Sequence, residues 1–263
     1  MHPDMVYSFP IWAVAAVVSG GAVVGAVLLE TGLRFLLAFD RRRMQNDVAA
    51  AVFSVMGVLY AVLLAFIVTL AWDGFNAARA TSFREAAAVA DVWQLAQGLP
   101  ADAAAPVREG ARAYARAVIA AEWPAQARGE RSDAAASALD GLWRAAAGFR
   151  PVTPADTNLH AALIAATTHL AEAREDRLLA VETTIPGIAW VVMVLGAAIT
   201  IAFGSFLRAP SLAMHAAMSG ALALSGALVL VLVIALSNPF RGDFRVSTDP
   251  FDRVLARMAA APE

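Results

Sequence analysis

Four long stretches that contain no Asp, Glu, Lys or Arg constrain this chain more than any other feature of its sequence. The stretches are Ile11–Leu29, Val48–Trp72, Ile185–Leu207 and Ser211–Leu236. Because a helix needs about 20 predominantly apolar residues to cross a bilayer, each of them is long enough to do so. The first stretch is too long for a signal-peptide core and follows no arginine, so we expect it to be retained. The sequence therefore predicts an all-α, polytopic membrane protein with four transmembrane helices.

The overall composition supports the same fold class. Hydrophobic residues make up 60% of the chain and charged residues 16%, whereas a soluble domain has about 45–50% and about 25%. The formal net charge of −2 leaves no basic surplus, so we expect no nucleic-acid partner. All basic residues are arginine and alanine is abundant, which is typical of GC-rich bacterial genomes. We expect a multi-pass protein of the bacterial inner (plasma) membrane.

The segment between the second and third stretches has a different composition. Residues 73–184 hold 11 arginines and 14 acidic residues. Gly98-Leu99-Pro100 predicts the end of one helix, and Thr153 followed by Pro154 and Asp156 predicts the start of another. We therefore expect a soluble helical bundle, with the second and third transmembrane helices continuing into it as two long helices.

These patterns divide the chain into four predicted regions. They are residues 1–72 with the first two transmembrane helices and a basic connecting loop, 73–184 with the soluble insert, 185–236 with the last two transmembrane helices, and 237–263 with a tail that contains a short amphipathic helix. An even number of spans puts the tail and the insert on one side, so we expect the tail helix to dock on the insert. The orientation stays open, because Arg41-Arg42-Arg43 favours an insert outside the cell, whereas the arginines of the tail favour the opposite.

Catalytic and metal-binding patterns are weak in this chain. No nucleophile, phosphate-loop or dinucleotide motif occurs in a suitable context, so we expect no enzyme and no cofactor. His169, Glu172 and Asp176 share a helix face, but charged neighbours interleave with them, which favours a solvated surface over a metal site. Glu122-Trp123-Pro124 is interpreted as a helix end with an aromatic anchor. The four stretches hold no charged side chain, which argues against a proton relay.

The second stretch carries the candidate functional residues. Large apolar side chains and one threonine recur on a single face of the predicted helix, at Val55, Leu59, Val62, Phe66 and Thr69. Such a face could line a pore whose apolar rings gate by excluding water. It could equally pack against the other three transmembrane helices.

Several motifs spread over nearly the whole chain resemble the bestrophin-like family of bacterial membrane proteins. They are Asn46-Asp47-Val48, the run Val52–Phe66, Trp72, Glu85-Ala86, Tyr114, Glu122-Trp123-Pro124, Arg174 with Arg177 before Pro186, and Asn238-Pro239-Phe240-Arg241-Gly242. The family name implies a distant similarity to bestrophins, which are pentameric anion channels with four membrane helices per subunit. In bestrophins the second helix lines the pore. The chain departs from animal bestrophins in lacking an acidic cluster like their calcium clasp.

Two functions are compatible with these observations. One is an oligomeric, bestrophin-like ion channel with the second transmembrane helix lining the pore. The other is a non-channel membrane scaffold or sensor whose helical insert binds a ligand or a partner protein. The expected partners are the lipid bilayer, further copies of the chain, and either ions or a protein.

Overall fold

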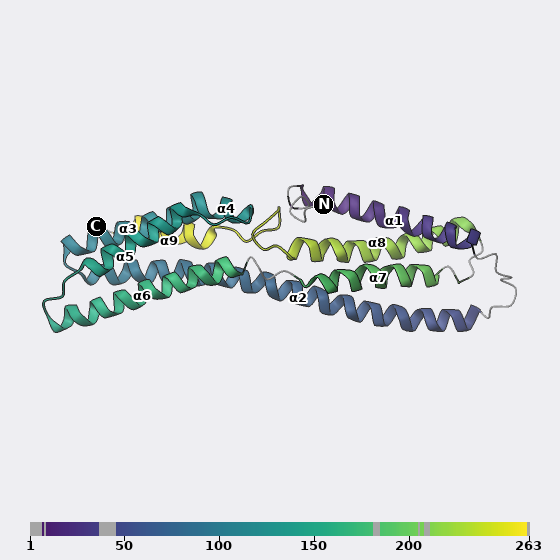
Figure 1. The fold of residues 1–263 in the computed structure, drawn as a ribbon, viewed down its shortest axis with the longest axis horizontal. Coiled ribbons are helices and arrows are strands. Elements are labelled where there is room, and N and C mark those ends of the chain that lie inside the picture. The colour runs from purple at the N-terminus through teal and green to yellow at the C-terminus, as the bar shows by residue number, and fades with distance from the viewer. Residues whose placement is uncertain are drawn as a thin grey trace. The chain divides into compact units, whose positions relative to one another are not determined.

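The computed structural model describes residues 7, 9–36, 46–180, 185–204, 206–207 and 211–261. Every regular element in this described part is a helix, so the all-α fold class is confirmed (Figure 1). The loop that carries Arg41-Arg42-Arg43 and the position of Arg208 lie outside the described residues.

Four of the helices are long and apolar enough to cross a membrane, as predicted. They are α1 (Ile11–Leu36), α2 (Asn46–Leu95), α7 (Gly187–Gly204) and α8 (Leu212–Leu236). The candidate span in α1 extends to Gly32 and therefore includes Glu30. The span therefore continues past the uncharged stretch Ile11–Leu29, and it takes in this ionisable side chain.

The chain divides into two compact units. Unit 1 comprises Met1–Asp73 and Thr184–Ser237, and unit 2 comprises Gly74–Thr183 and Asn238–Glu263. The long helix α2 contributes residues to both units. Its continuity confirms one of the two long helices expected from the sequence.

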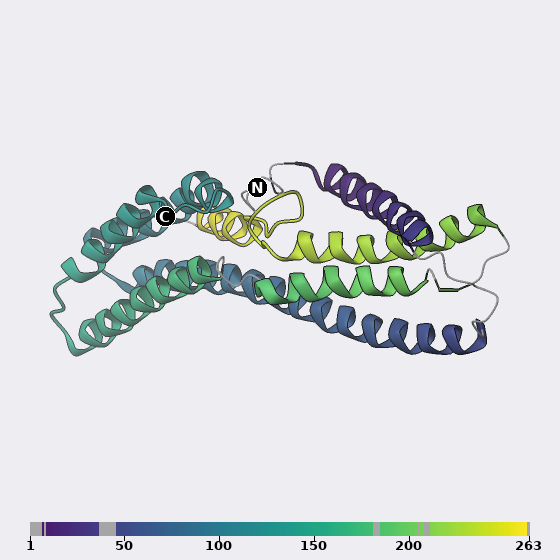
Figure 2. The same ribbon diagram turned by 45° about the vertical axis from the view of Figure 1, so that its right-hand side comes forward.

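Unit 1 contains the candidate spans. Helix α1 packs along α8, and α7 contacts both of them (Figures 1 and 2). The contact between α2 and α7 requires a glycine at position 196, because a Cβ atom there would lie 2.6 Å from the ring of Tyr60. Glycine therefore lets the tyrosine ring lie directly against the α7 backbone.

Unit 2 is a bundle built around the C-terminal part of α2. Its other elements are η2 (Ala96–Gly98), α3 (Ala101–Ala117), the π-helical turn η3 (Val118–Glu122), α4 (Trp123–Ala127), α5 (Asp133–Gly148), α6 (Pro154–Leu179) and α9 (Asp249–Ala260). Helix α6 starts with the predicted capping box, in which Thr153 and Asp156 exchange hydrogen bonds. Apolar side chains such as Val107, Leu142 and Leu163 are fully buried between the helices.

The tail helix α9 packs on the rest of unit 2, which confirms the expected docking of the tail. Phe251 is fully buried, and its ring meets that of Trp123 edge-on at 5.7 Å between centroids. Arg112 of α3 donates a hydrogen bond to the carbonyl of Met258 at 3.0 Å.

Two helix boundaries differ from those predicted. Helix α6 ends at Leu179 and α7 begins at Gly187. The prediction that the third transmembrane helix and the last helix of the insert form one long helix is therefore wrong. Pro186 lies in the break, and a proline disfavours helical conformation in the residue before it. Pro124 is predicted to end a helix, but it lies in the first turn of α4, which follows directly on η3 without leaving the helical conformation.

Candidate functional site

The five residues predicted to line a pore lie on one exposed face of α2. Their exposed fractions are 60% for Val55, 67% for Leu59, 50% for Val62 and 73% for Phe66, and Thr69 is exposed as well. The other spanning helices of the same chain cover none of them. The alternative that this face packs within the chain is therefore wrong, while the pore-lining role stays a prediction.

The opposite face of α2 makes the contacts with α7. The hydroxyl of Tyr60 donates to the carbonyl of Met193 at 2.8 Å, and the rings of Phe53 and Phe203 stack with centroids 6.5 Å apart. Ile67 lies seven residues after Tyr60, about two helical turns along the same face, and it is buried. Residues three or four apart share a helix face, so these contacts fix which side of α2 remains free.

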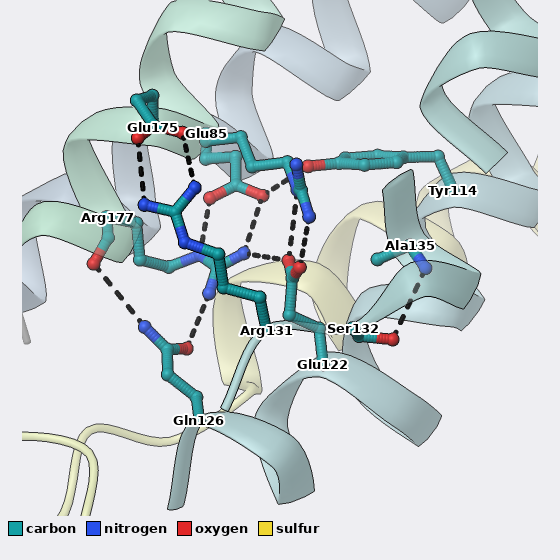
Figure 3. Close-up of polar contacts among 10 residues, drawn as sticks. Glu85, Tyr114, Glu122, Gln126, Arg131, Ser132, Ala135, Glu175 and Arg177 are labelled. Atoms are coloured by element: carbon teal, nitrogen blue, oxygen red, sulfur yellow. Dashed lines mark hydrogen bonds and ion pairs between the residues drawn. The ribbon is translucent and has the colours of Figure 1, made fainter. Parts of the chain in front are cut away.

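A second site is a cluster of buried charged residues inside unit 2 (Figure 3). Arg177 of α6, Glu85 of α2 and Glu122 of η3 have no exposed surface. Arg174 of α6 retains 13% exposure of its side chain. The two arginines balance the two glutamates, as is required of charges buried away from water.

Arg177 binds both carboxylates. Its Nη2 donates to Glu85 at 3.1 Å and to Glu122 at 2.5 Å, and its Nε donates to the other Glu85 oxygen. Its Nη1 donates to the side-chain oxygen of Gln126 in α4. Glu122 also accepts two hydrogen bonds from Arg174, of which the one from Nε is 3.3 Å long. One guanidinium therefore joins α2, η3, α4 and α6.

Two aromatic residues complete the cluster. Tyr114 of α3 donates its hydroxyl to Glu85 at 2.6 Å. The guanidinium carbon of Arg177 lies 5.0 Å from the ring centroid of Trp123, where the negative ring face attracts a cation. Trp123 meets Phe240 edge-on, so the cluster also contacts the segment before the tail helix.

Burial and charge shift the pKa values in this cluster. Burial, followed by the charge of Glu85, raises the pKa of Tyr114 well above its ordinary value. Burial by itself lowers the pKa of Arg177, but the carboxylates of Glu85 and Glu122 outweigh it, so this pKa is raised. The tyrosine therefore stays protonated and the arginine stays charged near neutral pH.

The hydrogen bonding indicates what this cluster can do. Each oxygen of Glu85 and Glu122 accepts at least one hydrogen bond. Such fully hydrogen-bonded carboxylates fix the helices that carry them. The cluster is therefore a junction between helices.

Sequence reasoning missed this junction, although it named most of its members as family motifs. Glu122 was interpreted as part of a helix end, yet it lies at the centre of the cluster. A signal was present in α6, whose apolar positions include Leu163, Leu170 and Ala173. Arg177 follows Ala173 by four residues and so lies on the same face. A charged side chain on a buried apolar face must be paired with an opposite charge, which predicts a buried partner.

Unit 1 contains a further buried pair that the sequence did not predict. Glu30 of α1 and His215 of α8 are 2% and 3% exposed, and Nδ1 of the histidine lies 3.3 Å from a carboxylate oxygen of the glutamate. The other ring nitrogen of His215 lies 3.1 Å from the carbonyl oxygen of Gly204. Ionisable residues within membrane spans face a partner in the bundle interior, as these do.

The face of α6 considered for metal binding is solvated. His169 and Glu172 are exposed, and Asp176 pairs with Arg84 across 3.6 Å at the surface. Within the described ranges, no group of three or more His, Cys, Asp or Glu could hold a metal ion.

Comparisons with known proteins identify the family. The model of the bestrophin-like domain matches residues 20–251. A point mutant of a bacterial bestrophin homologue from Klebsiella pneumoniae has a similar structure, with a TM-score of 0.66, 14% identity and coverage of 92% of this chain and 99% of that one. A crystal structure described as a membrane protein with a point substitution has the same TM-score and coverage, with 16% identity. No curated protein matches. Because the family model spans most of the chain, the protein belongs to the bestrophin-like family.

Proposed function

We propose that the chain is one subunit of a homo-oligomeric ion channel in the bacterial inner membrane, with α2 lining the pore. The observation that carries this proposal is the exposed face of α2 with Val55, Leu59, Val62 and Phe66. Membership of the bestrophin-like family supports it, because the second helix lines the pore in bestrophins. In this assignment residues 73–184 form the aqueous part of each subunit.

The chemistry of the face indicates how such a pore would be gated. It carries no charge, and the hydroxyl of its one polar member, Thr69, donates to the carbonyl of Ala65 at 2.9 Å. Rings of large apolar side chains exclude water from a narrow pore and so block ions. Phe66 is the largest member and the most exposed, so it would form the tightest ring.

The experiment measures ion flux across the membrane of lipid vesicles into which the full chain has been reconstituted. Phe66→Ser would make the ring polar, so flux should rise well above that of the parent. Leu228→Ser is the matched control, because Leu228 is 54% exposed on α8 and lies outside the proposed pore. It should leave the flux unchanged.

The oligomeric state gives an independent test. A closed ring in detergent supports the channel, whereas a monomer or dimer supports a scaffold or sensor. No flux for the parent and for both variants, with all three folded, would remove the channel proposal.

A further inference from the structure

Unit 1 contains a cavity of about 540 Å³ between its helices, and this cavity is partly open to the surface of the unit. Side chains from α1, α2, α7 and α8 all contribute to its wall, including Gly25, Gly57, Met193, Ala223 and Gly226. None of the residues that line it is charged. A cavity of this size and lining is large enough for a ligand and selects for an apolar one.

Water is a poor occupant of this cavity. Its polar lining side chains are Tyr60, Thr200 and Ser225. Each hydroxyl already donates to a backbone carbonyl, at 2.8 Å, 2.8 Å and 2.9 Å respectively. A buried water molecule needs two to four polar partners, and apolar cavities without them stay dry.

An empty cavity is also unfavourable, because its cost rises with its volume. The cavity of about 540 Å³ is far larger than the space that one water molecule needs, and its partly open side can admit a hydrocarbon chain from outside. The bilayer around a membrane-spanning bundle supplies such chains.

Three glycines keep the cavity open. A Cβ atom at Gly25, Gly57 or Gly226 would meet no atom within 4 Å, and all three residues line the cavity. We propose that this cavity is a binding site for one acyl chain of a membrane lipid. The proposal is independent of whether the chain conducts ions.

The test places a photoreactive, diazirine-bearing leucine analogue in the full chain at position 230, where Leu230 lines the cavity and the analogue takes up similar space. The control carries it at position 221, because Ala221 is on the same helix but is exposed outside the cavity. The protein is purified in detergent, washed until surface lipid has exchanged, irradiated, digested and analysed by mass spectrometry. We expect a membrane-lipid adduct at position 230 and a detergent adduct at position 221.

Two results would overturn the proposal: detergent adducts at both positions, or an adduct at position 230 to a second copy of the chain. Lipid extraction from washed, unlabelled protein provides a second measurement. Gly57→Leu should reduce the retained lipid to background, because the new side chain enters open space within the cavity. Ala221→Leu should retain as much lipid as the parent, and equal retention by both variants would also contradict the assignment.

Discussion

Arg177→Met would test whether the buried cluster holds unit 2 together. The substitution keeps an unbranched apolar stem but removes four side-chain hydrogen bonds, two to Glu85, one to Glu122 and one to Gln126. Glu122 keeps its ion pair with Arg174. Glu85 keeps only the hydroxyl of Tyr114, so it becomes the uncompensated buried charge.

The expected loss of stability is large. Removing one partner of a buried ion pair costs about 3–5 kcal/mol, because the remaining charge is left without compensation. For a protein of this size, each kcal/mol lost from the free energy of unfolding lowers the unfolding midpoint by about 2–4 °C. The Arg177→Met protein should therefore melt roughly 6–20 °C below the parent.

Thermal unfolding in detergent, followed by circular dichroism, measures this shift. Arg131→Met is the matched control, since Arg131 pairs with Glu175 at the surface with 58% and 48% side-chain exposure. Such an exposed pair contributes about 0–1 kcal/mol. Glu85→Gln added to Arg177→Met should recover part of the loss by removing the uncompensated charge. The reasoning fails if Arg177→Met melts no lower than Arg131→Met, or if the second substitution recovers nothing.

Three further predictions concern unit 2. The raised pKa of Tyr114 means that the unfolded chain loses this proton near pH 10 while the folded chain keeps it, so stability should fall as the pH rises above about 10. Tyr114→Phe should flatten that fall in alkaline denaturation, and an unchanged slope would contradict the assignment. In thermal unfolding, Phe251→Asp should destabilise more than Leu255→Asp, because Phe251 is fully buried and Leu255 is half-buried; no shift from either substitution would show that α9 is loosely held. Thr153→Ala should cost about 0.5–2 kcal/mol through loss of the helix cap, whereas Thr153→Ser should cost much less.

The features predicted correctly depend on residues close together in the sequence. The four spans follow from uncharged runs, and the start of α6 follows from Thr153, Pro154 and Asp156, which lie within four residues of one another. The continuity of α2 follows from a helical pattern that no proline interrupts. In each of these elements, local preference and tertiary packing favour the same structure.

The features that were missed depend on residues far apart. Glu85 and Arg177 are separated by 92 positions, so no local pattern shows that they form a pair. Glu30 lies one residue beyond its uncharged run, and its partner His215 is on another helix. The break between α6 and α7 was also missed, because a helical pattern on both sides of Pro186 conceals an interruption of the backbone.

The π-helical turn η3 sets the rotational register of the helices on either side of it. Tyr114 and Glu122 are eight residues apart, and both contact the central ion pair. At 3.6 residues per turn, eight residues of regular α-helix would leave the two side chains about 80° apart. One extra residue in the turn makes the eight behave like seven, which is close to two full turns, so both side chains point to the same side. Deleting Ala120 would restore a regular helix with Tyr114 and Glu122 seven positions apart, so Glu122 would still face Arg177, whereas inserting one residue there would rotate Glu122 by about 100° away from it. The segment from Tyr114 to Glu122 should therefore tolerate the loss of one residue but not the gain of one.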